Sequence, residues 1–164
     1  MNLGNLGSKQ SVSTTEKIKL LVFPIGSLNG ALHIDVVQKV VNLSKVYSSG
    51  LNQYGMVNVE GKEITVIDLH KRLFDIPQPF TQEDKKYLLL AQNSADEKFG
   101  IIINNTPSLV DISLDNIRTL PPSYRQADTL KIASHVTVID DDQKNNLTVF
   151  ILDPDELISP FSSI

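Results

Sequence analysis

Short runs of Val, Ile and Leu, separated by turn-forming residues, dominate the pattern of the chain from residue 18 onward. Residues 18–25 are almost continuously apolar and predict a strand. A turn is predicted over residues 27–30 and a second strand over residues 31–34. Asp35 is a candidate cap for a single helical turn, after which residues 39–43 resume an extended course.

The clearest local signal is a hairpin formed by residues 55–59 and 62–67. Glu60 and Gly61 separate the two runs, and Gly61 supplies the positive φ that a tight hairpin turn needs. Asp68 follows directly and is expected to cap a short helix over residues 69–74.

Residues 76–86 are expected to form a seam inside the chain, because two prolines and several charged or amide side chains resist both helix and strand. Asp153-Pro154 begins a helical turn that continues to Ile158. Further strands are predicted over residues 87–91, 99–103, 109–112, 136–139 and 147–152. About nine short strands with only short helices predict a mainly β protein built from barrels or a sandwich.

Composition narrows the classes of partner and compartment. The 164 residues fit one domain, expected over residues 17–160. Their net charge of −4 offers no basic surface for nucleic acid or anionic lipid, and we expect no direct insertion into a membrane. Zero cysteine excludes disulfides and thiolate metal sites and fits a reducing compartment, so we expect a cytoplasmic protein with protein partners. Residues 1–16 have no apolar segment and are expected to be a disordered tail.

The residues that could carry chemistry do not form a motif. Three histidines are far apart in the sequence: His33, His70 and His135. The acidic run of residues 140–142 is similar to the start of a calcium loop, but Asn145 and Ile151 occupy the places of its Gly and Glu. No phosphate-binding glycine motif occurs either. We therefore expect no metal, no cofactor and no catalysis.

The passage Gly55-Met-Val-Asn-Val-Glu-Gly-Lys-Glu-Ile-Thr-Val-Ile-Asp-Leu-His-Lys-Arg-Leu73 resembles the central signature of CheW-like domains, the adaptors of bacterial chemosensory arrays. Segments on both sides are similar as well, so the resemblance covers residues 18–158. It implies two five-stranded β-barrels that share one hydrophobic core, with short helices. It also implies a non-catalytic adaptor whose partners are the regulatory domain of a CheA-type histidine kinase and the cytoplasmic tip of a chemoreceptor.

The resemblance further implies a set of partner-binding residues: Val36, Lys39, Gly55, Asn58 and Glu60. Two of them depart from the family, which usually has Glu at the position of Lys39 and Arg at that of Glu60. His33 and Asn104 also depart, standing where the family has Pro and Asp. If Lys39 and Glu60 face each other, a family ion pair has been swapped in polarity. If they face partners, those partners must differ, and the sequence leaves both readings open.

The resemblance favours an adaptor in chemotaxis, phototaxis or type IV pilus motility, recruited to receptor arrays. One alternative is a diverged CheW-like competitor without kinase coupling. Another is a small-ligand-binding β-barrel module, but the sequence shows no group of converging polar residues, and four Tyr and six Phe are few for such a pocket.

Overall fold

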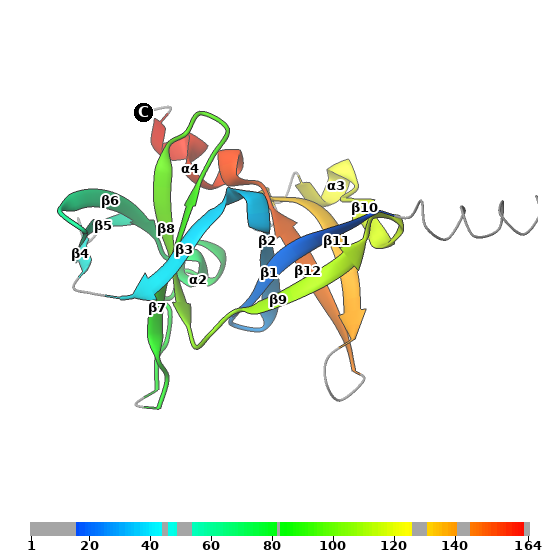
Figure 1. Cartoon of the computed structure of the whole chain (residues 1–164), viewed down its shortest axis with the longest axis horizontal. Coiled ribbons are helices and arrows are strands. Elements are labelled where there is room, and N and C mark those ends of the chain that lie inside the picture. The colour runs from blue at the N-terminus through cyan, green and yellow to red at the C-terminus, as the bar shows by residue number, and fades with distance from the viewer. Residues whose placement is uncertain are drawn as a thin grey trace, which may run out of the picture.

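The computed structural model describes residues 16–43, 46–48, 54–81, 83–125, 131–140 and 145–162 (Figure 1). The expected N-terminal tail lies outside this range apart from Glu16, and so do Asp141 and Asp142 of the acidic run. No helix among the described residues is long and apolar enough to cross a membrane.

The strands form two sheets. Sheet A has the order β10 (Ile117–Thr119), β11 (Ala133–Asp140), β12 (Asn146–Leu152), β2 (Leu28–His33), β1 (Lys17–Ile25) and β9 (Ser108–Ser113). Sheet B has the order β3 (Val37–Asn42), β7 (Lys86–Gln92), β8 (Lys98–Asn104), β6 (Lys62–Ile67), β5 (Tyr54–Val59) and β4 (Val46–Ser48). The mainly β, two-barrel architecture is confirmed. Each sheet has six strands rather than five, because β4 and β10 add a three-residue strand at one edge.

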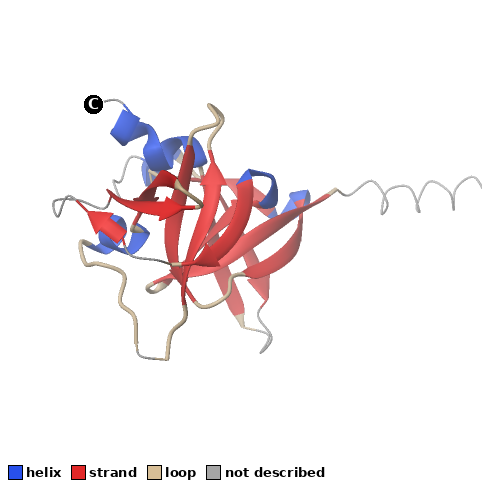
Figure 2. Ribbon diagram, turned by 60° about the vertical axis from the view of Figure 1, so that its left-hand side comes forward, coloured by secondary structure: helices blue, strands red, loops and turns tan. Residues whose placement is uncertain are grey.

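The helices are short (Figure 2), and Leu69 and Leu157, which belong to two of them, are buried in the core that the sheets share. The helices are η1 (Ile34–Val36), α2 (Leu69–Phe74), η2 (Leu114–Asn116), α3 (Pro122–Arg125) and α4 (Pro154–Ser162). The expected cap of α2 is confirmed, since Oδ1 of Asp68 accepts a hydrogen bond from the Lys71 amide at 3.0 Å.

Two local predictions were wrong. The first turn occupies Gly26 and Ser27 rather than residues 27–30, because Ile25 already pairs with Leu28 and Gly26 adopts a positive φ of 59°. The cap of η1 is His33 rather than Asp35. Nδ1 of His33 accepts from the Asp35 amide at 3.0 Å, which places Asp35 inside the turn.

The two sheets have the same strand arrangement although the chain passes from A to B and back. β1 and β2 pair within sheet A, the chain builds all of sheet B from β3 to β8, and β9 to β12 then complete sheet A. Each sheet contains one parallel pair, β2 with β12 and β6 with β8. In Figure 1 the blue β1 and β2 consequently lie beside the orange strands from the end of the chain.

Alternation along the strands divides the apolar residues among three cores. In β1, Leu21 and Phe23 contribute to a shared core between the sheets, whereas Leu20 contributes to a core inside sheet A. In β7, Leu89 faces the shared core and Leu88 faces a core inside sheet B. Strands buried on both faces need near-continuous apolar runs, which explains the pattern of residues 18–25 and 87–91.

The expected seam, residues 76–86, connects α2 to β7. Oδ2 of Asp68 accepts from the Gln78 amide at 2.9 Å, and Oδ2 of Asp84 accepts from the Thr81 amide at 2.8 Å. Asn105 also donates to Asp84, at 3.1 Å. Apart from Lys86, which begins β7, the described part of this segment thus has no helix or strand, and hydrogen bonds to carboxylates hold it in place.

Candidate partner-binding surface

A β-bulge at the start of β3 sets the direction of Lys39. Val37 pairs with Ala91 of β7, but Lys39 pairs with Leu90, so the register shifts between them. Val37 packs against the shared core, whereas Leu90 belongs to the sheet B core. Because directly paired residues share a face of the sheet, the bulge turns Lys39 toward the inner side of sheet B.

The hairpin between β5 and β6 presents Glu60 at its tip. Glu60 and Gly61 both have positive φ, 53° and 82°, as a two-residue type I′ turn requires. Oδ1 of Asn58 accepts from the Gly61 amide at 3.1 Å and so stabilises the turn. The predicted hairpin is confirmed, and this hydrogen bond gives Asn58 a local structural role.

Lys39 and Glu60 form an ion pair, with Nζ donating to Oε1 at 2.5 Å. Three strands lie between β3 and β5 in the sheet order, so the pair can form only because sheet B curls until its ends approach. The hydrogen bond from Lys39, and then its charge, hold the pKa of the Glu60 carboxyl below its usual 4.5. Lys39 and Glu60 therefore face each other in the structure.

Val36 and Gly55 occupy different environments. Val36 ends η1, is half-buried and packs against the shared core. Gly55 pairs with Val66, which belongs to the sheet B core, so Gly55 lies on the inner side of its strand. It is five residues from Glu60, or roughly 16 Å along a strand. The structure thus brings Lys39 and Glu60 together and places Gly55 away from the hairpin tip.

Two exposed apolar residues that the sequence analysis did not single out border the shared core. Val40 of β3 pairs with Leu89 and is 36% exposed, and Leu109 of β9 pairs with Leu21 and is 55% exposed. Their partners Leu89 and Leu21 are both buried in the shared core. Strand alternation was the available signal, but it could not show that β3 and β9 are edge strands, each with a hydrogen-bonded neighbour on one side only in the described structure.

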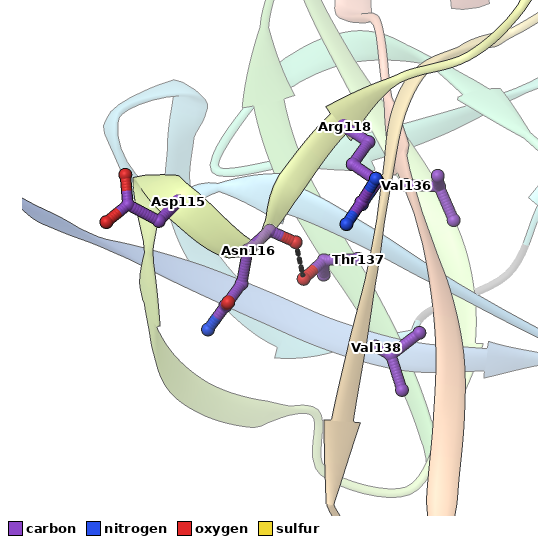
Figure 3. Close-up of a pocket in the computed structure, with 6 residues that line it drawn as sticks. All are labelled: Asp115, Asn116, Arg118, Val136, Thr137 and Val138. Atoms are coloured by element: carbon purple, nitrogen blue, oxygen red, sulfur yellow. Dashed lines mark hydrogen bonds between the residues drawn. The ribbon is translucent and has the colours of Figure 1, made fainter.

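A hollow of about 250 Å³ lies where η2 and β10 meet β11, and Figure 3 shows its lining. The Thr137 hydroxyl donates to the Asn116 carbonyl at 2.8 Å. Asp115 and Arg118 lie on opposite sides of the group, and the remaining side chains are valines. The polar groups do not converge on one point, as they do in most small-ligand sites.

The histidines are engaged separately. His33 caps η1, while Nδ1 of His70 is 2.7 Å from the Ile76 carbonyl and Nδ1 of His135 is 2.7 Å from the Ser134 hydroxyl. Within the described ranges, no three His, Asp or Glu side chains gather as a metal site would require.

Comparison with known proteins agrees with this architecture. A crystal structure of the scaffolding protein TtCheW from Thermoanaerobacter tengcongensis is similar, with a TM-score of 0.67, 24% identity, and coverage of 84% of this chain and 85% of that one. No curated protein matches the sequence. The model of the CheW-like domain matches residues 19–161, nearly the whole described chain. The protein therefore belongs to the CheW-like domain family.

Proposed function

We propose that the protein is a non-catalytic adaptor that couples a CheA-type histidine kinase to chemoreceptors in a cytoplasmic signalling array. The observation that carries this proposal is the family match over residues 19–161. The exposed apolar residues beside the shared core support it, because solvent-facing apolar side chains at an edge strand suit protein contacts. In this proposal the kinase and the receptor, not the adaptor, determine whether the pathway controls flagella or pili.

We propose that the partner contacts lie on η1, β3 and the β5–β6 hairpin. The residues are Val36, Lys39, Asn58 and Glu60, together with Gly55 on the inner side of β5. In this proposal Lys39 and Glu60 act as one unit, since their ion pair fixes the hairpin tip relative to β3. Val40 follows Lys39 on β3, faces the opposite side of that strand and supplies apolar contact area.

The function is tested with a CheA-type histidine kinase and a methyl-accepting chemoreceptor from the same organism. We expect the protein to bind the purified regulatory domain of the kinase and to raise kinase autophosphorylation in the presence of receptor-containing membranes. Val40→Asp is expected to weaken binding at least tenfold, because interface hot spots are costly to alter. Leu114→Asp is the control, since Leu114 is 43% exposed but lies in η2, beside sheet A.

The outcomes separate the alternatives. Binding to the receptor that lowers kinase activity would identify a competitor without kinase coupling. Absence of binding to both partners by the folded protein would refute the adaptor role.

A further inference from the structure

A second surface hollow lies at the end of sheet A near the β11–β12 connection. Its volume is about 270 Å³. The walls are mostly apolar and include Val22, Pro24, Val110 and Leu147. Polar groups from Asn29, Ser108 and Asp140 also line it.

The register of sheet B shows which residue occupies the equivalent place there. In sheet B, Lys39, Val40 and Val41 of β3 pair with Leu90, Leu89 and Leu88 of β7. In sheet A, Ser108, Leu109 and Val110 of β9 pair with Val22, Leu21 and Leu20 of β1. In both triplets the middle pair faces the shared core and the outer pairs face the core of their own sheet. Ser108 therefore occupies in sheet A the position of Lys39 in sheet B.

The acidic partner has an equivalent as well. Val59 packs against the sheet B core at the end of β5, and Glu60 follows it. Ile139 packs against the sheet A core near the end of β11, and Asp140 follows it. Glu60 pairs with Lys39, but among the described residues no cation pairs with Asp140. Sheet A therefore has a carboxylate, Asp140, at the place of Glu60, but a short serine, Ser108, at the place of Lys39.

We propose that this hollow is a socket for a lysine side chain of a partner protein, which would bind Asp140 as Lys39 binds Glu60. The apolar walls match the aliphatic stem of lysine, and the carboxylate at the rim matches its ammonium group. The Ser108 hydroxyl and the Asn29 side-chain oxygen can accept further hydrogen bonds from the ammonium. This inference rests on the proposed adaptor function, since it requires a protein partner.

The socket is tested first without any partner, by titrating the full chain with n-butylammonium chloride and following methyl signals by NMR. We expect saturable shifts at Val110, Ile139 and Leu147, with a dissociation constant on the order of 10 mM for a four-carbon stem. Asp140→Asn should weaken binding about fivefold, because it removes the charge without changing the shape of the side chain. n-Butanol is the neutral control. Its binding to the wild type should be no stronger than the binding of butylammonium to Asp140→Asn, because in both cases one of the two charges is missing.

Three results would overturn the proposal. They are equal binding of n-butanol and butylammonium, no effect of Asp140→Asn, and shifts that occur only in Lys144→Ala. The last result would mean that Lys144, which lies outside the described residues, fills the socket within the chain.

A second experiment uses the kinase regulatory domain and the receptor as partners. Ser108→Lys should fill the socket from within, abolish the butylammonium shifts and weaken binding of one partner about tenfold. Ser108→Ala removes one hydrogen-bond acceptor but leaves the socket open, so it should keep the butylammonium shifts and weaken binding only about twofold. Unchanged binding of Ser108→Lys to both partners would refute the role in recognition. If the wild type binds neither partner, the adaptor function fails, and the butylammonium titration still decides whether the socket exists.

Discussion

Sheet B closes its curled strands with the ion pair of Lys39 and Glu60, whereas sheet A has Ser108 and Asp140 beside an open hollow at the equivalent place. The two sheets share strand order, the position of the parallel pair and the register next to the shared core. Backbone topology therefore does not determine how the end of each sheet is completed. That choice depends on one or two exposed side chains, which can change without disturbing any of the three cores.

The largest effect is expected when the shared core that joins the two sheets is damaged. Phe99 of β8 is fully buried there, and Phe99→Ala should lower the free energy of unfolding by about 3–5 kcal/mol. Because both sheets contribute to this core, reporters in sheets A and B should lose their signals in one transition in urea. Sheet A signals that outlast those of sheet B would show that the sheets are independent units.

Gly100 of β8 and Gly30 of β2 lie in the parallel strand pairs and allow the packing of the two sheets to be compared. A Cβ at Gly100 would lie 2.7 and 2.9 Å from Cδ1 and Cγ of Leu88, which is fully buried in the sheet B core. At Gly30 the close contact is the terminal Cδ1 of Ile25, at 2.8 Å, and the next atom is 3.4 Å away. Gly100→Ala should therefore cost about 1–3 kcal/mol by overpacking, and Gly30→Ala clearly less. Chemical denaturation measures both, and equal costs would contradict this difference in packing.

Reversing the ion pair of sheet B tests whether its charges act as a unit. Lys39→Glu or Glu60→Arg alone puts two like charges together and should lower the melting temperature by about 1–2 °C. The double variant restores a pair of opposite polarity and should recover both the melting temperature and partner binding to within about threefold. A double-mutant cycle with no coupling, together with lost binding, would instead make each charge a direct contact with a partner.

The smallest expected effect is a loss of stability at low pH. The pKa of Glu60 is lowered by Lys39 and that of Asp111 by Lys19, which is 2.8 Å away across β1 and β9. Since both pKa values are lower in the folded protein, their stabilisation is present above the usual values of 4.5 and 3.8 and is lost as the pH falls through the lowered ones.

NMR titration of the carboxyl groups measures this effect. Lys39→Met should return the Glu60 pKa toward 4.5 and leave Asp111 unchanged. Asp84 is the internal control. Its pKa is lowered first by a hydrogen bond from the Thr81 amide and not by a lysine, so Lys39→Met should leave it unchanged. A Glu60 carboxyl that titrates at the same pH in wild type and Lys39→Met would contradict the role of the pair.

Much of the fold followed from residue patterns, because strands buried on one or both faces need recognisable apolar spacing. The hairpin with Gly61 and the helix capped by Asp68 were predictable, since each depends on neighbours in sequence. β4 and β10 were not, because three residues are too few to show a period. The histidine cap of η1 was also missed, since His33 is an unusual side chain for that role.

The candidate site was less predictable than the fold. The resemblance singled out Lys39 and Glu60, but their contact depends on a bulge and on the curl of a whole sheet. The equivalence of Ser108 with Lys39 depends on strand pairings between residues far apart in sequence, which local patterns do not encode.

The return of the chain to sheet A also affects how the protein folds during synthesis. β1 and β2 are made before all of sheet B, whereas their partners β9 and β12 are made after it. At about 5–20 residues per second, the roughly 110 residues between β2 and β12 take about 6–22 s to produce. During that time the first hairpin carries apolar residues on both faces without its partners. This hairpin can therefore be completed into sheet A only after β9 to β12 have been made.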